Sequence, residues 1–427
     1  MRTVVRIFFL FFCASVAHAT EGIPAARDGI DVALHLAATR HPAVMSKREE
    51  LKALGFELES AEFQRFPILS VSATTTDDIS GSSPDTDDQY DRVIAVVRQP
   101  LWVGGRIQGA IGQARVKQEI GRLSLLAVQR DLMENTVAAY AGVQGARQRL
   151  EAAELNVREH ERLSSLITRR EEGGIASLAD VQLASSRLSQ ALSQKIQIEA
   201  AMQRALNDLL AMTQLPLPAT TQVPADLTEL PPLERIAGDI EKTSATVQQR
   251  LLEVDLARVT VDLATAELLP RLYAKLEQDI YTSSERGEDP EGTRVGLVLE
   301  GAVEGMGVSG WKKVKSSDAR VVAARQNVES ARNDLRRRVQ ALLTDLQSLQ
   351  QVLQSNEMLV QSTELTLASF MRQFDAGRRS WVDVMNSQRE MSDARLAREQ
   401  TRSSLLETQL RLAVQLGQFD QQAGAQP

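Results

Sequence analysis

The feature that most limits the fold is the run from Ser317 to Phe374, which contains neither proline nor glycine. Apolar residues recur in this run every seven positions: Val339, Leu346, Leu353, Val360, Leu367 and Phe374. Sustained heptads are typical of helices that pack along their whole length as coiled coils, rather than around a globular core. We therefore expect one continuous helix over 311–377, about 100 Å long at 1.5 Å per residue.

The chain also repeats itself at an offset of 203 residues. The segment "EEGGIASLADVQLASSRLSQA" (171–191) aligns with "FDAGRRSWVDVMNSQREMSDA" (374–394). A repeat of this length is one architectural unit used twice, so a second long helix is expected over 106–172. Shorter helices are expected over 31–65, 175–213, 244–269 and 379–417. Since the combined length of 244–269 and 175–213 matches one long helix, we expect these two helices to stack end to end.

Four short segments are typical of strands. "RFPILSVSATTT" and "YDRVIAVVRQPLW" enclose an acidic loop, and "RLYAKLEQDIYT" and "TRVGLVLEGAV" enclose a second polar loop. Segments of about ten residues with one apolar face fit the strands of a membrane barrel. Because about eight strands make the smallest closed barrel, four strands per chain require several chains to share one barrel. The predicted fold class is mainly α with a small membrane β-barrel.

These patterns divide the chain into five parts. We expect a signal peptide over 1–19, a first repeat over 20–213, a proline-rich linker over 214–243, a second repeat over 244–417 and a flexible C-terminal tail over 418–427. Each repeat has the order helix, two strands, long helix, short helix. The linker is expected to be irregular because it holds five of the thirteen prolines.

The first nineteen residues indicate export. Two arginines flank the apolar run "IFFLFFCASV", and Ala17-His18-Ala19 is a small-x-small cleavage signal. Cleavage after Ala19 would remove Cys13, the only cysteine, which excludes disulfides and zinc–thiolate sites. The remaining 47 basic and 56 acidic residues argue against nucleic acid as a partner. No metal or cofactor is expected, because the other histidines lack partners at metal-ligand spacing and are expected to be ordinary surface or helix residues: His35, His41 and His160.

One motif suggests an enzyme instead. Gly305-x-Gly307-x-x-Gly310 follows a strand-like segment and precedes a helix, as in dinucleotide-binding folds. That fold needs a parallel strand to return within a unit of about 30 residues, whereas the helix here continues far beyond that length. The corresponding turn of the first repeat, at Gly104 and Gly105, lacks the fingerprint. We interpret all four joint glycines as places where flexible φ/ψ values let a strand turn into a helix: Gly104, Gly105, Gly307 and Gly310.

Three segments stand at matching places around the long helices: "QPLWVGGRIQGAIGQAR", "GGIASLADVQLASSRL" and "GRRSWVDVMNSQREMSDARL". Together with the repeat, they resemble the TolC family of outer-membrane export ducts over nearly all of the mature chain. The resemblance implies a homotrimer, with a twelve-stranded barrel in the outer membrane above a twelve-helix periplasmic barrel, and no enzymatic activity or cofactor. It also implies a periplasmic adaptor protein and an inner-membrane transporter as partners.

The resemblance extends to a choice of cargo. "GRRSWVDVMN" and the degenerate second joint are most similar to the ducts of type I secretion systems, which serve an ABC transporter and export proteins such as large adhesins. The alternative is efflux of small molecules with a proton-driven pump. The cargo itself cannot be read from the sequence.

The resemblance also assigns residues at the periplasmic tip. Asp383 takes the place of the first constriction aspartate of the family, and Asn386 stands where other members have a second one. Phe374 and Arg379 match positions that tie the tip shut, and Asp180 matches their acceptor. Because Phe374 lacks the hydroxyl of the tyrosine common there, one closing hydrogen bond is expected to be absent.

Two alternatives stay open. Asp180 and Asp383 each follow a serine by three positions, as the acidic residue of a helix-capping box does, so either could cap a helix rather than line a pore. A periplasmic coiled-coil adaptor would also contain long helices, but it would have one helical hairpin and no strand pairs nested among helices. Trp381 is expected to be a packing anchor between the helices of the second tip.

Overall fold

The computed structural model describes residues 29–76, 90–217, 230–283, 292–301, 307–421 and 424. The predicted signal peptide, Cys13 and Gly305 lie outside the described residues. In chain order the elements are α1 (Gly29–Arg40), α2 (Pro42–Phe63), β1 (Ile68–Thr76), β2 (Tyr90–Trp102), α3 (Arg106–Glu172), α4 (Leu178–Thr213), α5 (Leu233–Thr243), α6 (Ala245–Ala266), β3 (Arg271–Ser283), β4 (Thr293–Glu300), α7 (Val308–Asp375) and α8 (Trp381–Gln415). The prediction of a mainly helical chain with four strands is confirmed.

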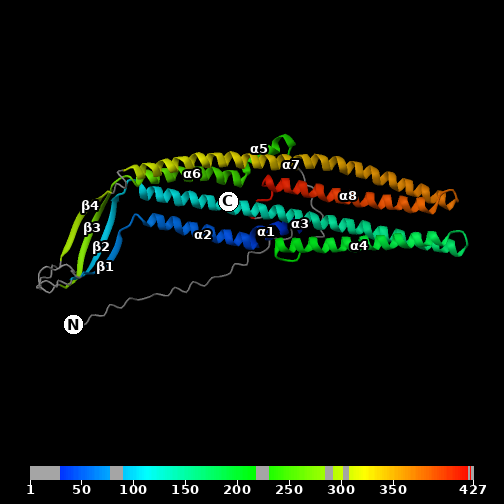
Figure 1. The fold of residues 1–427 in the computed structure, drawn as a ribbon, viewed down its shortest axis with the longest axis horizontal. Coiled ribbons are helices and arrows are strands. Elements are labelled where there is room, and N and C mark those ends of the chain that lie inside the picture. Colours follow the sequence, from blue (N-terminus) through cyan, green and yellow to red (C-terminus); the bar gives the residue numbers. More distant parts are fainter. Residues whose placement is uncertain are drawn as a thin grey trace.

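The two long helices extend along the whole molecule, with the strands at one end and helix–turn–helix tips at the other (Figure 1). α3 has 67 residues and α7 has 68, so each is about 100 Å long. The heptad positions Val339, Leu346 and Val360 of α7 are buried, as the seven-residue pattern predicts. None of the described helices is both long enough and apolar enough to cross a bilayer.

The shorter helices pair end to end in a different way from the one expected. α6 and α8 form one line that packs against both α3 and α7, and α2 and α4 form another line against α3 (Figure 1). The expected stack of 244–269 on 175–213 is therefore wrong. Each broken line packs on the long helix of its own half, because short joints and tips connect it to that helix. One chain thus presents four helical lines side by side.

The predicted helix over 31–65 is two helices, divided at His41 and Pro42. Proline has no backbone N–H to continue the ladder of hydrogen bonds from α1, but it is well suited to the first turn of a new helix. The His41 ring caps this new helix, since its Nδ1 accepts a hydrogen bond from the backbone N–H of Ala43 at 3.2 Å.

Two segments expected to be irregular are packed instead. The linker contains α5, whose Ile236 and Ile240 are fully buried against α7 because they lie one turn apart on a single helix face. The expected flexible tail, 418–427, includes Phe419, which is fully buried in the central core. The next residue, Asp420, forms an ion pair with Arg130 of α3 at 2.6 Å. Residues 418–420 are therefore part of the folded body.

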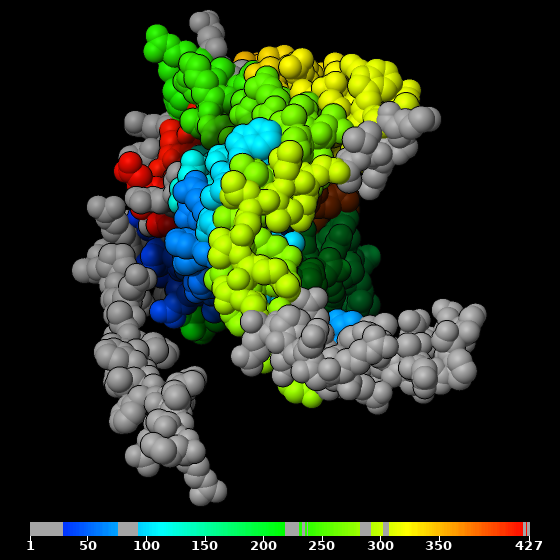
Figure 2. Space-filling model, turned by 90° about the vertical axis from the view of Figure 1, so that its left-hand side faces the viewer, coloured from blue at the N-terminus to red at the C-terminus, as the bar shows by residue number. Residues whose placement is uncertain are grey.

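The four strands form one antiparallel sheet in the order β1-β2-β3-β4. Figure 2 views the molecule from this end, with the strands in front of the helices. The paired residues Leu69, Val97, Leu276 and Val295 form a row across one face of this sheet. Val295 is 79% exposed within the single chain. The opposite face carries charges from β3 and β4, listed with their ion-pair distances: Lys275–Glu277 at 2.6 Å, Arg294–Glu277 at 3.0 Å and Arg294–Asp279 at 2.9 Å. One face is thus apolar and the other charged.

A half-buried carboxyl on α3 gives a pH-dependent prediction. Burial raises the pKa of Glu134, and Asp131 raises it further, against the effects of Arg338 and Arg411. The folded chain thus holds this proton more tightly than the unfolded chain does. This difference in pKa stabilises the folded chain at pH values below the ordinary pKa of glutamate. The stabilisation is lost as the pH rises through the pKa that Glu134 has in the folded chain.

Glu134→Gln is therefore expected to raise the melting temperature at pH 7 and to have little effect at pH 4. Glutamine keeps an acceptor for the side chain of Gln415, which donates to Glu134. Thermal unfolding at both pH values measures this, with Glu151→Gln on the exposed side of α3 as control. An equal shift at both pH values would contradict it.

Candidate functional site at the helical tip

The two tip turns share one backbone conformation. The first joins α3 to α4 and the second joins α7 to α8, and each contains a glycine with φ of 72°, Gly174 and Gly377. Only glycine adopts this left-handed region without strain. Each following helix is N-capped by a serine, Ser177 or Ser380, whose side chain accepts a hydrogen bond from a backbone N–H of the first turn. The repeat therefore extends to the details of the turns.

An apolar cluster joins the two hairpins behind these turns. Phe374 of α7 and Trp381 of α8 contact each other with ring centroids 5.1 Å apart. Trp381 is only 3% exposed, which confirms its packing role. The other buried members come from three helices: Leu163, Ile167, Ala184, Val384 and Met385. Because α3 and α4 contribute as well as α7 and α8, the cluster holds the two hairpins together within one chain.

Arg170 is a tip residue that the sequence did not reveal. Its guanidinium lies over the Phe374 ring, 4.4 Å from the centroid, and it also forms an ion pair with Asp375 at 2.8 Å. It thus connects α3 to the end of α7. A comparison of the two copies of the repeat does mark this position, because Arg170 of the first copy aligns with the uncharged Gln373 of the second.

The two aspartates of the repeat differ in their contacts. The carboxylate of Asp180 accepts hydrogen bonds from the backbone N–H and the hydroxyl of Ser177, at 3.2 and 2.7 Å, and so completes a capping box. The backbone N–H of Asp383 donates to Ser380, but its carboxylate is half-exposed and lies 3.5 Å from Nε of Arg379. Capping thus engages the first carboxylate and leaves the second available.

The remaining predicted tip residues lie near Asp383. The Arg379 guanidinium covers the Phe370 ring, 3.9 Å from the centroid, and in the described part of the chain it forms neither a hydrogen bond nor an ion pair with Asp180. Asn386 is half-buried on α8, three residues after Asp383 and therefore about one turn along the same helix face. Within one chain the structure brings together Arg379, Asp383 and Asn386, and places Asp180 on the other hairpin.

The joints at the strand end require glycine for two different reasons. Gly104, Gly105 and Gly307 have φ values of 62°, 85° and 84°, where other residues are strained. A Cβ atom on Gly104 would also lie 2.7 Å from Cβ of Leu269. Gly310 lies inside α7 instead of at the turn, and a Cβ there would lie 2.2 Å from Cδ2 of Leu268. Its absent side chain allows α7 to approach the segment after α6.

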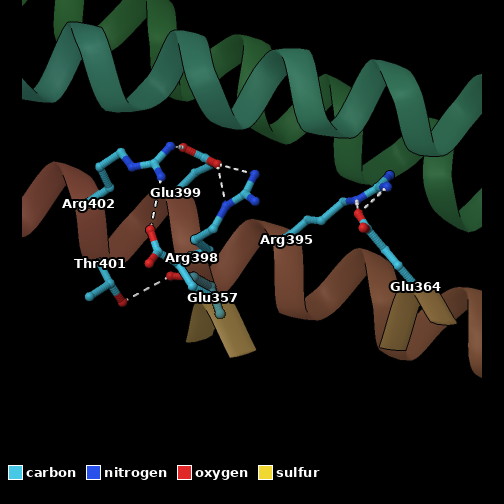
Figure 3. A network of polar contacts seen from close by, with 8 residues as sticks. Glu357, Glu364, Arg395, Arg398, Glu399, Thr401 and Arg402 are labelled. Carbon is cyan, nitrogen blue, oxygen red and sulfur yellow. Dashed lines mark hydrogen bonds and ion pairs between the residues drawn. The ribbon is translucent and has the colours of Figure 1, made fainter. Parts of the chain in front are cut away.

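Ion pairs tie α7 to α8 within the second hairpin (Figure 3). Glu364 of α7 contacts Arg395 at 2.6 Å, and Glu357, one heptad earlier, contacts Arg402 at 3.3 Å. The same Arg402 also contacts Glu399, which is only 5% exposed. These contacts at heptad spacing add to the packing of α7 against α8.

A sheet at one end that continues through glycine joints into two long helical hairpins defines a class of protein, the outer-membrane channel subunits with a periplasmic helical extension. The chain belongs to the Outer membrane efflux protein family, whose model matches residues 33–213 and 237–418. This family is non-enzymatic. The glycine fingerprint around Gly307 and Gly310 is thus structural, and the coiled-coil adaptor is excluded.

Solved structures of outer-membrane channels share the fold. The outer-membrane channel OprN is 17% identical with a TM-score of 0.77, covering 91% of this chain and 90% of that one. CusC is 15% identical with a TM-score of 0.80, covering 91% and 92%. VceC from Vibrio cholerae is 16% identical with a TM-score of 0.76, covering 91% and 96%. No curated protein sequence matches the chain. At these identities the structures establish the fold alone.

Proposed function

We propose that three copies of this chain form one outer-membrane channel that releases small molecules, received through a periplasmic adaptor from a proton-driven inner-membrane pump. The observation that carries the proposal is the match of the efflux family model to both halves of the chain. The geometry of the single chain adds two reasons for several copies, one from the sheet and one from the helices.

The sheet needs further strands to complete it. Among the described residues, β1 and β4 each have one neighbouring strand and one open edge. The backbone groups of an open edge have no partner in a lipid bilayer, so a membrane sheet must close on itself. Three copies would supply twelve strands, with the apolar row of Leu69 to Val295 facing lipid and the charges around Arg294 facing the bore.

The helical wall has two flanks whose apolar side chains are left exposed by the described part of the chain. On α2, Phe56 and Phe63 are 67% and 66% exposed, on the face away from α3. On α7, Val308 and Trp311 are 58% and 52% exposed. α2 and α7 stand at opposite sides of the set of four helical lines, and these residues lie toward the strand end of both. We call the contact of α2 with α7 of the next copy the seam.

Charges on the two flanks are complementary. Exposed glutamates surround the phenylalanines of α2, and two exposed lysines lie over the Trp311 ring of α7: Glu57, Glu59 and Glu62 on α2, and Lys312 and Lys315 on α7. Opposite charges at an interface select the register and the partner. A second copy of the chain therefore fits both flanks.

Three copies would form a bore of useful width. Four helical lines per chain give twelve around a ring, and a spacing of about 10 Å gives a circumference near 120 Å. Subtracting one helix diameter of about 10 Å leaves an opening of roughly 28 Å. Small molecules and unfolded polypeptides both pass through such an opening, so width alone does not select the cargo.

Type I secretion of a large protein through an ABC transporter is the second candidate. It is supported by the similarity of "GRRSWVDVMN" and the second joint to ducts of that kind. That similarity rests on short segments, whereas the efflux family model matches most of the chain. Efflux is therefore the preferred function, in place of the secretion favoured by the tip sequence.

Deletion of the gene separates the two functions. Efflux predicts that the deletion strain becomes more sensitive to toxic small molecules and retains its surface adhesins, and that the wild-type chain restores resistance. Loss of a surface protein with unchanged sensitivity would overturn efflux and support type I secretion.

We further propose that Asp383 lines the closed tip of the bore while Asp180 only caps a helix. Asp383→Asn is then expected to lower the preference of single channels for cations over anions. Asp180→Asn, the same change at the repeat-related position, is expected to leave selectivity unchanged and to cost about 0.3–1 kcal/mol of helix stability. Reversal potentials in planar bilayers measure both, and equal selectivity of Asp383→Asn and wild type would refute the lining role.

Phe374 and Arg379 are proposed to hold the tip closed. Replacing both by alanine removes the ring that contacts Trp381 and Arg170, and the cation over Phe370. Single-channel conductance is expected to rise. The control is Arg378→Ala, a substitution of an exposed neighbour. A double variant that conducts no better than wild type would show that Phe374 and Arg379 do not hold the tip closed.

A further inference from the structure

A polar cavity of about 300 Å³ lies between the two hairpins, and we call it the hairpin cavity. Its walls come from three helices: Asn156 and His160 on α3, Arg187 on α4, and Arg389 and Ser392 on α8. His160, expected to be an ordinary surface or helix residue, is only 4% exposed. Because α3 and α4 belong to the first hairpin and α8 to the second, a ligand here would contact both.

Two buried nitrogen atoms of the hairpin cavity lack partners. Nδ1 of His160 and Nε of Arg187 are buried, and neither has a hydrogen-bond partner in the described part of the chain. Within the described ranges, the one hydrogen bond of the Arg187 guanidinium is to the side chain of Gln190, at 3.0 Å. Neither Arg187 nor Arg389 has a carboxylate within 4 Å among the described residues. Buried donors left unpaired are costly, so a ligand that accepts hydrogen bonds would be stabilised here.

The charges around the hairpin cavity favour an anion. Arg187 and Arg389 are opposed by one carboxylate in the lining, Asp393. His160 is kept neutral near pH 7, because burial lowers its pKa and the charge of Arg187 lowers it further, against the opposite effect of Glu159. Guanidinium groups with a neutral histidine and amides are the donor set that binds phosphate-like groups.

We propose that the hairpin cavity binds a small tetrahedral oxyanion, such as phosphate or sulfate, held by Arg187 from one hairpin, Arg389 from the other, and His160 between them. An anion held from both sides joins the hairpins. Bound anion therefore favours the arrangement in which α8 lies against α3, where Gln388 donates to Asn156 at 3.2 Å. This second step rests on the proposed channel function, whereas binding itself does not.

Calorimetric titration of the assembled protein in detergent with sulfate, at an ionic strength held constant with sodium chloride, tests binding. Wild type is expected to bind, and Arg187→Gln and Arg389→Gln are each expected to weaken binding at least about tenfold, since each removes a charged donor. Arg204→Gln is the matched control, because Arg204 is exposed on α4 and outside the cavity lining. Absence of binding to wild type, or equal binding to all four proteins, would overturn the site.

The pH dependence tests the part of His160. The charge of sulfate is constant between pH 6 and 8, so tighter binding at pH 6 would report a proton taken up by the protein. A bound anion raises the pKa of His160 and favours that proton. His160→Gln is expected to remove the pH dependence, and an unchanged pH dependence in this variant would exclude His160 as the proton acceptor.

Conductance measurements distinguish the joining of the hairpins by the anion from the proposed channel function. Sulfate added to wild-type channels is expected to lower conductance, with no effect on Arg389→Gln. If a protein that binds sulfate shows unchanged conductance, the binding site stands but the anion does not join the hairpins. Absence of any conductance in every variant would count against the proposed channel instead.

Discussion

A chain carrying Phe56→Asp and Phe63→Asp is expected to fold as a protomer and to lose its trimer. Both rings are about two-thirds exposed in the single chain, so the protomer does not depend on them. Burying a phenylalanine contributes about 1.5–3 kcal/mol, and each seam would lose two and gain buried carboxylates beside Glu57 and Glu59. Because a closed trimer has three seams, the equilibrium is expected to move almost completely to single chains.

Light scattering on the detergent-solubilised protein measures this loss of mass, with circular dichroism to confirm that helical content is retained. Phe56→Leu with Phe63→Leu is the control, because it keeps an apolar seam and is expected to remain trimeric. A trimeric aspartate variant would show that α2 does not form the seam.

Gly104→Ala is expected to destabilise the joint between β2 and α3 far more than Gly105→Ala. Both glycines have positive φ values, and an L-residue there costs about 1–2 kcal/mol. A Cβ on Gly105 meets nothing within 4 Å, whereas a Cβ on Gly104 overlaps Leu269. Overpacking of this kind adds about 1–3 kcal/mol, so the total at Gly104 is about 2–5 kcal/mol.

Chemical denaturation of both variants measures the difference between their free energies of unfolding. Both variants carry the same backbone strain, and only Gly104→Ala also overlaps Leu269. Equal losses of stability would mean that the approach of Leu269 does not constrain the joint. The yield of assembled protein in the outer membrane is expected to follow the same order.

Much of the helical architecture could be predicted because its causes are local. The run without proline or glycine before Phe374 and the heptads within it determine a helix wherever the chain packs. The turns at Gly174 and Gly377 are predictable for the same reason, because glycine punctuates and serine caps.

The errors concern long-range packing. Lengths alone suggested that α6 stacks on α4, but which helices share a line depends on contacts that α6 makes with α3 and α7. Phe419 and the isoleucines of α5 follow proline or polar residues, and their burial depends on surfaces that distant helices supply. A single-sequence pattern contains no information on those surfaces.

At the tip, the sequence identified the positions but not their contacts. Ser177-x-x-Asp180 and Ser380-x-x-Asp383 are identical as patterns, and only the structure shows that one carboxylate completes a cap while the other lies beside Arg379. The contact of Arg170 with Phe374 joins residues about two hundred positions apart. A comparison of the two repeats, which differ at this position, is the one sequence signal for it.

Native mass spectrometry of the mature chain, released from lipid nanodiscs, tests most directly whether one chain is a third of a membrane channel. We expect a complex of three chains that is recovered only with lipid or detergent. A single chain that stays soluble in water and does not enter nanodiscs would contradict it.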